Sequence, residues 1–253
     1  MLIQEWLLNP LEYLVENVQF LVLGIVTLIF VIVTLIVSGR MIYQGIKLKV
    51  STFSYVGIEY IGVASCWFGV ALNFVSILLF NTVPAWELHF IAHGGILTIA
   101  QIFWVFAMTK LLPIKEKYHK KIQIAAIIIG LIVEITYIII IFTNQSWLGI
   151  PVAPIQIVYG PFSYIYLMAQ LLVFTFFGFW FVIESLKSAN PKVKLKGKFL
   201  ALSFSLFTFA SFLEVFFTEI WVFIIARLII MSSAFLFYIG FMLPEQIEKI
   251  FLK

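Results

Sequence analysis

Charged residues are scarce in this chain, and aspartate is missing altogether. Only 11% of the 253 residues are charged and 63% are hydrophobic, against about 25% and roughly 45–50% in soluble proteins. All 12 acidic residues are glutamate. A chain with so little charge is expected to expose apolar surface to lipid, so the bilayer is its predicted partner.

Cysteine and the short motifs of soluble enzymes are also rare or missing. The single cysteine, Cys66, has no second thiol for an intrachain disulfide. No Walker loop, GxSxG, CxxC or HExxH pattern occurs. An enzyme is therefore the less favoured class, and no catalytic residue is predicted.

Long apolar runs divide the chain into about seven segments, each long enough to cross a hydrocarbon core of about 30 Å as a helix. The runs cover residues 19–38, 55–80, 86–112, 121–142, 161–186, 198–218 and 220–243. An outer-membrane barrel would instead alternate apolar and polar residues over segments of about 10. The predicted fold class is an all-α integral membrane protein, a seven-transmembrane-helix bundle.

Lysine and arginine cluster in alternate loops, and this distribution predicts the orientation of the chain. The loop and tail residues are Arg40, Lys47, Lys49, Lys110, Lys115, Lys117, Lys120, Lys121, Lys187, Lys192, Lys194, Lys196, Lys198, Lys249 and Lys253. The opposite segments, residues 1–18, 81–86, 143–160 and 219–220, contain neither lysine nor arginine. The positive-inside rule then puts the N-terminus outside and the C-terminus in the cytoplasm of a multi-pass cell-membrane protein. The positive-inside distribution accounts for the net positive charge of the chain, so no nucleic-acid partner is predicted.

Two short segments are predicted to flank the membrane domain of residues 19–243. Residues 1–18 mix apolar, aromatic and glutamate side chains as an amphipathic helix on the outer surface does. Residues 244–253 are expected to form a cytoplasmic juxtamembrane tail. The loop of residues 143–160 is long for this chain and is expected to close an outer vestibule as a lid.

Polar side chains inside the apolar runs are few, and most fall in the outer half of the predicted bundle. An ionised group costs about 2.5–3.5 kcal/mol at a helix centre, so each one needs a physical reason. The residues that we expect around a ligand pocket are Asn73, His89, His93, Glu134, Gln170, Glu214 and Arg227. Glu59 differs because it falls near the cytoplasmic end of its run, where a surface location is expected.

Glu214 and Arg227 lie on either side of the last predicted turn, at depths that differ by about 5 Å. Such a pair is expected to lock the last two helices together, since breaking it would strand a charge in a low dielectric. Alternatively, Arg227 anchors an anionic ligand, because its guanidinium group can hold a carboxylate or phosphate.

His89 and His93 are one helical turn apart on one face. They are weak candidates for a metal site, because zinc needs three or four ligands. Haem is disfavoured because no second intramembrane helix carries a histidine. Retinal is disfavoured because the last run has no lysine for a Schiff base, so no cofactor is predicted.

The predicted architecture and the last helix, which ends in the segment from Phe241 to Ile250, resemble the seven-helix sensor regions that precede prokaryotic histidine kinases and related signalling proteins. The resemblance is one of architecture and covers most of the chain. It implies a receptor-like protein with a small ligand in an outer-half pocket and a signalling partner at the basic cytoplasmic loops. In that family the last helix continues into a signalling module, so either the effector is a separate protein or the function differs.

Other classes stay open at this point. A small transporter or channel would use Glu134 and the histidines for proton coupling. A subunit of a larger membrane complex needs no site of its own, and a lipid-modifying enzyme would need a nucleophile that we do not find. The sequence predicts neither the ligand nor the oligomeric state.

Overall fold

A computed structural model describes residues 5–252, and helices make up about 83% of it, as expected for an all-α membrane protein. The helices are η1 (Glu5–Leu7), α1 (Pro10–Glu16), α2 (Val18–Lys47), α3 (Ser51–Ser65), α4 (Phe68–Phe80), α5 (Trp86–Gly94), α6 (Leu97–Leu111), α7 (Glu116–Thr143), η2 (Gln145–Trp147), α8 (Pro161–Lys187), α9 (Pro191–Phe216), α10 (Ile220–Met242) and α11 (Glu245–Phe251). The strands are β1 (Gly149–Ala153) and β2 (Gln156–Tyr159). The ends of the two predicted flanking segments, residues 1–4 and 253, lie outside the described residues.

Six helical segments in the described part of the chain are long and apolar enough to cross a membrane. They are α2, α5 and α6 together, α7, α8, α9 and α10. The pair α3 and α4 passes the same test jointly but is bent by 61°. The chain therefore has six such segments, or seven if the bent pair forms one span, as the sequence predicted.

The bend between α3 and α4 falls at Cys66 and Trp67, inside the predicted run of residues 55–80. The hydroxyl of Ser65 donates to the carbonyl of Gly62 at 2.6 Å. A side chain that bonds the backbone in this way competes with the helical hydrogen bonds and favours a bend. Neither glycine nor proline marks the break, so the sequence alone does not predict it.

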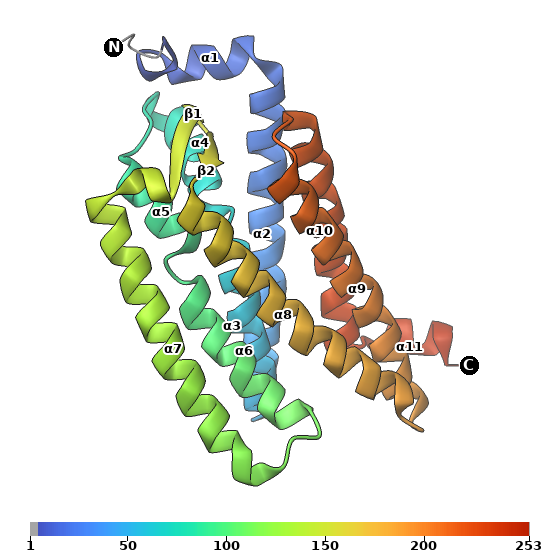
Figure 1. The fold of residues 1–253 in the computed structure, drawn as a ribbon. Helices are drawn as coiled ribbons and strands as arrows, with labels where there is room; N and C mark the ends of the chain where they lie inside the picture. The colour runs from blue at the N-terminus through green and yellow to red at the C-terminus, as the bar shows by residue number, and fades with distance from the viewer. Residues whose placement is uncertain (1–4, 253) are drawn as a thin grey trace.

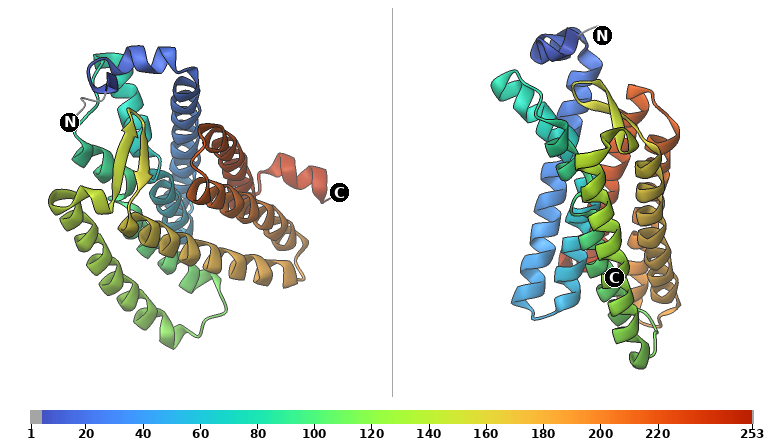
Figure 2. Two further views of the ribbon diagram at one scale, coloured as in Figure 1. Left: turned by 45° about the horizontal axis from the view of Figure 1, so that its top comes forward. Right: turned by 60° about the vertical axis from the view of Figure 1, so that its left-hand side comes forward.

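The helices pack as a bundle in which α10 lies between α2 and α9, while α3 lies between α2 and α6 (Figure 1). Helix α8 packs mainly on α9, and α7 packs mainly on α6. Figure 2 shows α1 across one end of the bundle, beside the β1–β2 hairpin. We call this end the hairpin end and the opposite one, with the α6–α7 and α8–α9 links, the basic end.

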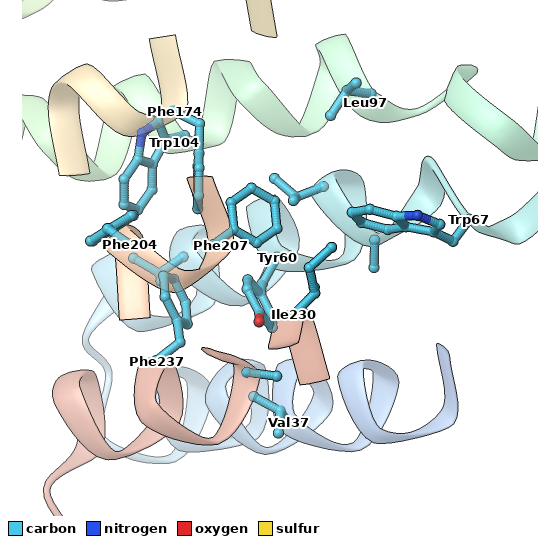
Figure 3. Close-up of a cluster of buried hydrophobic side chains, with 14 of the residues drawn as sticks. Val37, Tyr60, Trp67, Leu97, Trp104, Phe174, Phe204, Phe207, Ile230 and Phe237 are labelled. Carbon is cyan, nitrogen blue, oxygen red and sulfur yellow. The ribbon is translucent and has the colours of Figure 1, made fainter. Parts of the chain in front are cut away.

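The centre of the bundle is aromatic (Figure 3). The rings of Tyr60 and Phe237 stack with their centroids 4.3 Å apart, and those of Trp104 and Phe174 lie 5.0 Å apart. Such pairs contribute about 0.5–1.5 kcal/mol each beyond the area they bury. Helices in lipid associate through this kind of close packing, since lipid tails are as apolar as the side chains.

Glu59 corrects one expectation from the sequence, because its side chain is fully buried and does not lie at the surface. It shares a face of α3 with Val56, Tyr60 and Val63, all buried. Helix α3 packs on both α2 and α6, and Tyr60 of this face also stacks on Phe237 of α10. Neither carboxylate oxygen has a hydrogen-bond partner among the described residues.

Candidate functional site

Glu214 of α9 and Arg227 of α10 form an ion pair near the hairpin end. Arg227 Nη1 donates to Glu214 Oε1 at 2.5 Å and to Oε2 at 2.6 Å, and both residues are buried. The similar depths seen in the sequence thus correspond to a real contact. The short link between α9 and α10 places the two side chains on facing helices.

Two further residues complete the surroundings of the ion pair. Trp67 Nε1 donates to Glu214 Oε2 at 2.9 Å, and the guanidinium of Arg227 lies 5.2 Å from the centre of the indole ring. Arg227 Nε donates to Thr27 Oγ1 of α2 at 3.1 Å. The bend after α3 brings Trp67 to this position, so the pair joins α2, α9, α10 and the α3–α4 break.

His89 and His93 of α5 are buried with their rings nearly parallel and 5.8 Å apart. None of their four ring nitrogens has a hydrogen-bond partner within residues 5–252. Helix α4 allows this close packing at Gly69, where an added Cβ would lie 2.7 Å from the His89 carbonyl oxygen. Buried polar atoms are nearly always paired, so four unpaired nitrogens call for an explanation.

The Glu214–Arg227 ion pair and the two histidines line the same small cavity of about 30 Å³, which we call the polar chamber. Its polar lining consists of His89, His93, Gln156, Tyr159, Glu214 and Arg227, with Cys66 beside them. Burial raises the pKa of the Tyr159 phenol, so this hydroxyl stays protonated and can donate a hydrogen bond. The chamber therefore offers a guanidinium, two imidazoles and a phenol to a small polar group.

The β1–β2 hairpin covers the polar chamber at the hairpin end. Ile155, Gln156, Ile157 and Tyr159 all line the chamber from this side. The residues between the two strands turn inward, and Ile155 is 1% exposed. The loop expected to act as a lid is thus an antiparallel hairpin over the cavity.

Asn73 of α4 anchors the hairpin and does not line the chamber. Its Nδ2 donates to the carbonyl of Pro154 at 3.0 Å, and the residue is fully buried. A second contact runs from Gln156 Nε2 to the carbonyl of Thr218, between α9 and α10, at 3.3 Å. The cap is therefore tied to both sides of the bundle.

Glu134 and Gln170 belong to a different group of polar residues, between α6, α7 and α8. Gln170 Nε2 donates to Thr98 Oγ1 at 3.0 Å, and the Thr98 hydroxyl lies 2.9 Å from the Tyr166 hydroxyl. Glu134 is buried against this group, and its Oε2 has no hydrogen-bond partner in the described part of the chain. The predicted pocket set is therefore split: His89, His93, Glu214 and Arg227 line the polar chamber, whereas Asn73, Glu134 and Gln170 do not.

Tyr159, Trp67 and Gln156 are site residues that the sequence did not single out. Tyr159 and Gln156 stand in a loop whose polar residues have no helical periodicity, and Trp67 is one aromatic among many. Only the fold of the hairpin and the break after α3 bring them to the chamber. Within residues 5–252 no group of three or more histidine, cysteine or acidic side chains is placed to hold a metal ion.

The chain matches no known family model, and neither a curated protein nor a solved structure is significantly similar to it. Its function is therefore inferred from the residues and geometry of the site.

Proposed function

We propose that this chain is a receptor-like membrane protein that binds a small ligand in the polar chamber and transmits its binding to a cytoplasmic partner. In this proposal the hairpin end faces outward and the basic end faces the cytoplasm, following the positive-inside rule. The α2–α3, α6–α7 and α8–α9 links lie at the same end of the bundle (Figure 1). Lysines stand within or beside each link, among them Lys49, Lys115 and Lys192, which supports this orientation.

The four unpaired ring nitrogens of His89 and His93 carry the proposal. A pair of histidines that served only to fill the core would be expected to bond to neighbouring backbone or side chains. Here they face a capped cavity that also contains Arg227 and the hydroxyl of Tyr159. Convergent polar groups in a concave pocket are typical of a binding site.

Helix α10 offers a physical connection between the chamber and the basic end. Arg227 lies near its first turns, and the carbonyl of Phe241 near its other end accepts a hydrogen bond from Lys196 Nζ at 2.8 Å. Lys192 also pairs with Glu248 of α11 at 2.5 Å. A ligand that shifts Arg227 would move α10 and, with it, the surface at the basic end. Only a difference in affinity between two such states transmits a signal.

Small molecules that co-purify with the protein test the proposal directly. Full-length wild type, His89→Ala, His93→Ala and the control His119→Ala would be purified alike, and the molecules released on denaturation would be identified by mass spectrometry. His119 is the matched control because its ring bonds the Ile114 carbonyl at 2.9 Å, at the basic end. We expect one molecule bound to wild type and His119→Ala and at least tenfold depleted in the other two. Identical profiles from all four proteins, including profiles without any bound molecule, would contradict the proposal.

A small proton-coupled transporter is the second candidate, and buried carboxylates favour it. Glu134 has one carboxylate oxygen without a partner among the described residues, and Glu59 has two. Intramembrane carboxylates of this kind are common in proton relays. Uptake of a solute into proteoliposomes by wild type, with loss in Glu134→Gln, would favour transport over sensing.

A further inference from the structure

We propose that the ligand of the polar chamber is a long-chain monocarboxylate that reaches it sideways from the bilayer, between α7 and α8. The proposal rests on the proposed binding function and specifies the chemical class of the ligand and its route. It is argued from three neighbouring cavities that lie between the lipid-facing side of the bundle and the chamber and share lining residues.

The first of these cavities is a cleft between α6, α7 and α8, with a volume of about 410 Å³. Helices α7 and α8 diverge here (Figures 1 and 2), and α7 packs chiefly on α6. Several side chains that line the cleft are also exposed on the outside of the bundle, including Ile129 at 62%, Ile132 at 61% and Ile165 at 73%. The cleft therefore opens toward lipid.

A second, inner cavity of about 70 Å³ adjoins the cleft. Gln101 and Gln170 line both cavities. Val63, Leu97, Leu171 and Phe174 are among the apolar residues of the inner cavity, so its walls suit a hydrocarbon chain. Gln101 stands at the junction, and neither of its amide atoms has a hydrogen-bond partner among the described residues.

The inner cavity in turn adjoins the polar chamber. Cys66, Tyr159 and Glu214 line both spaces. An apolar path that ends in polar groups matches a molecule with a tail and a small head. The lining thus changes from aliphatic side chains in the cleft to imidazole and guanidinium in the chamber.

The chamber restricts the head group by size and by charge. A volume of about 30 Å³ favours a head group of a few heavy atoms over the larger glycerophosphate head of a two-chain lipid. Arg227 uses Nε for Thr27 and Nη1 for Glu214, while its Nη2 donates to no group in the described part of the chain. A carboxylate can accept hydrogen bonds from this nitrogen, from the imidazoles and from Tyr159. The chamber also contains the Glu214 carboxylate, whose two oxygens are held by Arg227 and Trp67, and the remaining donors offset part of the cost of desolvating a second carboxylate there.

Photolabelling tests the route. The purified full chain in phosphatidylcholine nanodiscs would be irradiated with a 16-carbon fatty acid that carries a diazirine in its tail, and labelled peptides would be mapped by mass spectrometry. Ala126→Trp and Ala169→Trp place an indole in the cleft. Ala125→Trp is the matched control, since this exposed neighbour does not line the cleft.

We expect labelling of α6, α7 and α8 around the cleft in wild type and in Ala125→Trp, and at least tenfold less in both cleft variants. Excess unlabelled palmitate should compete, whereas the alcohol of the same length, which lacks the carboxylate, should not. Labels spread over all lipid-facing helices, or unchanged in the cleft variants, would overturn the proposal. Suppose that the histidine variants lose a bound water-soluble molecule but the fatty acid probe does not label the residues around the cleft. The fatty acid inference then fails, while the proposed binding function stands. If the histidine variants lose nothing, the binding function itself fails.

Discussion

At the residue scale, the contacts of Glu214 follow from burying a charge in a medium that does not solvate it. Both oxygens of its carboxylate are bonded, one to Arg227 alone and the other to Arg227 and Trp67. The ion pair is predictable from sequence because the two residues flank one tight turn at similar depth. The contact with Trp67 is not, because it depends on a helix break that no glycine or proline marks.

Removing one member of the ion pair should destabilise the protein strongly. Arg227→Met leaves Glu214 buried without its cation, and such a loss costs about 3–5 kcal/mol. The double variant Glu214→Leu/Arg227→Met removes both charges and should recover most of that free energy. Unfolding in mixed detergent micelles measures both. A double variant as unstable as Arg227→Met would contradict the assignment of an ion pair.

The hydrogen bond from Trp67 allows a comparison with a second buried tryptophan. Trp67→Phe removes the donor to Glu214, and a hydrogen bond to a charged group contributes about 1.5–3 kcal/mol. Trp104 is also fully buried, but its Nε1 has no hydrogen-bond partner in the described structure. Trp104→Phe therefore loses packing alone. The same unfolding measurement should show the larger loss for Trp67→Phe, and equal losses would argue against the bond.

At the scale of elements, the hairpin and the bent pair show where prediction from sequence fails. The run of residues 55–80 is predominantly apolar on both sides of residues 66 and 67, so its hydropathy gives no sign of the 61° bend. The loop of residues 143–160 was expected to close a vestibule, but its strands were not predicted. Long-range contacts, such as that of Asn73 with Pro154, define how the hairpin sits on the bundle.

Weakening the anchor of the hairpin should expose the polar chamber. The single cysteine, Cys66, lines the chamber and provides a probe of access by a water-soluble thiol reagent. Asn73→Ala removes a hydrogen bond of about 0.5–1.5 kcal/mol, so modification of Cys66 should become roughly 2- to 13-fold faster. Asn144→Ala serves as control, since the side chain of Asn144 accepts only the local hydrogen bond from the Ser146 hydroxyl. No difference between the two variants would mean that Asn73 does not hold the cap closed.

At the scale of the whole molecule, the number of spans determines which loops lie on the same side of the membrane. Lysine falls on a single side only if the chain crosses seven times. The long apolar runs appear as helices in the structure because lipid demands that each crossing segment satisfy its own backbone hydrogen bonds. The division of polar residues between two groups was not predictable, because a depth estimate does not say which helices face each other. Glu134 and Arg227 are both predicted around one ligand pocket, yet Arg227 lines the polar chamber and Glu134 does not.

The bent pair α3 and α4 decides the topology. If it crosses the membrane, seven spans put the two termini on opposite sides and the polar chamber outside. If the pair turns back, six spans put both termini on one side. The links with lysine in or beside them would then no longer all lie on the cytoplasmic side of the membrane.

Accessibility of terminal tags in intact cells tests this account most directly. Epitope tags at the N-terminus and the C-terminus would be probed with antibody before and after permeabilisation, with a third tag in the α6–α7 link as an internal marker. The account predicts an N-terminal tag that is reached in intact cells, and C-terminal and link tags that are reached only after permeabilisation. Detection of both termini from the same side would contradict it.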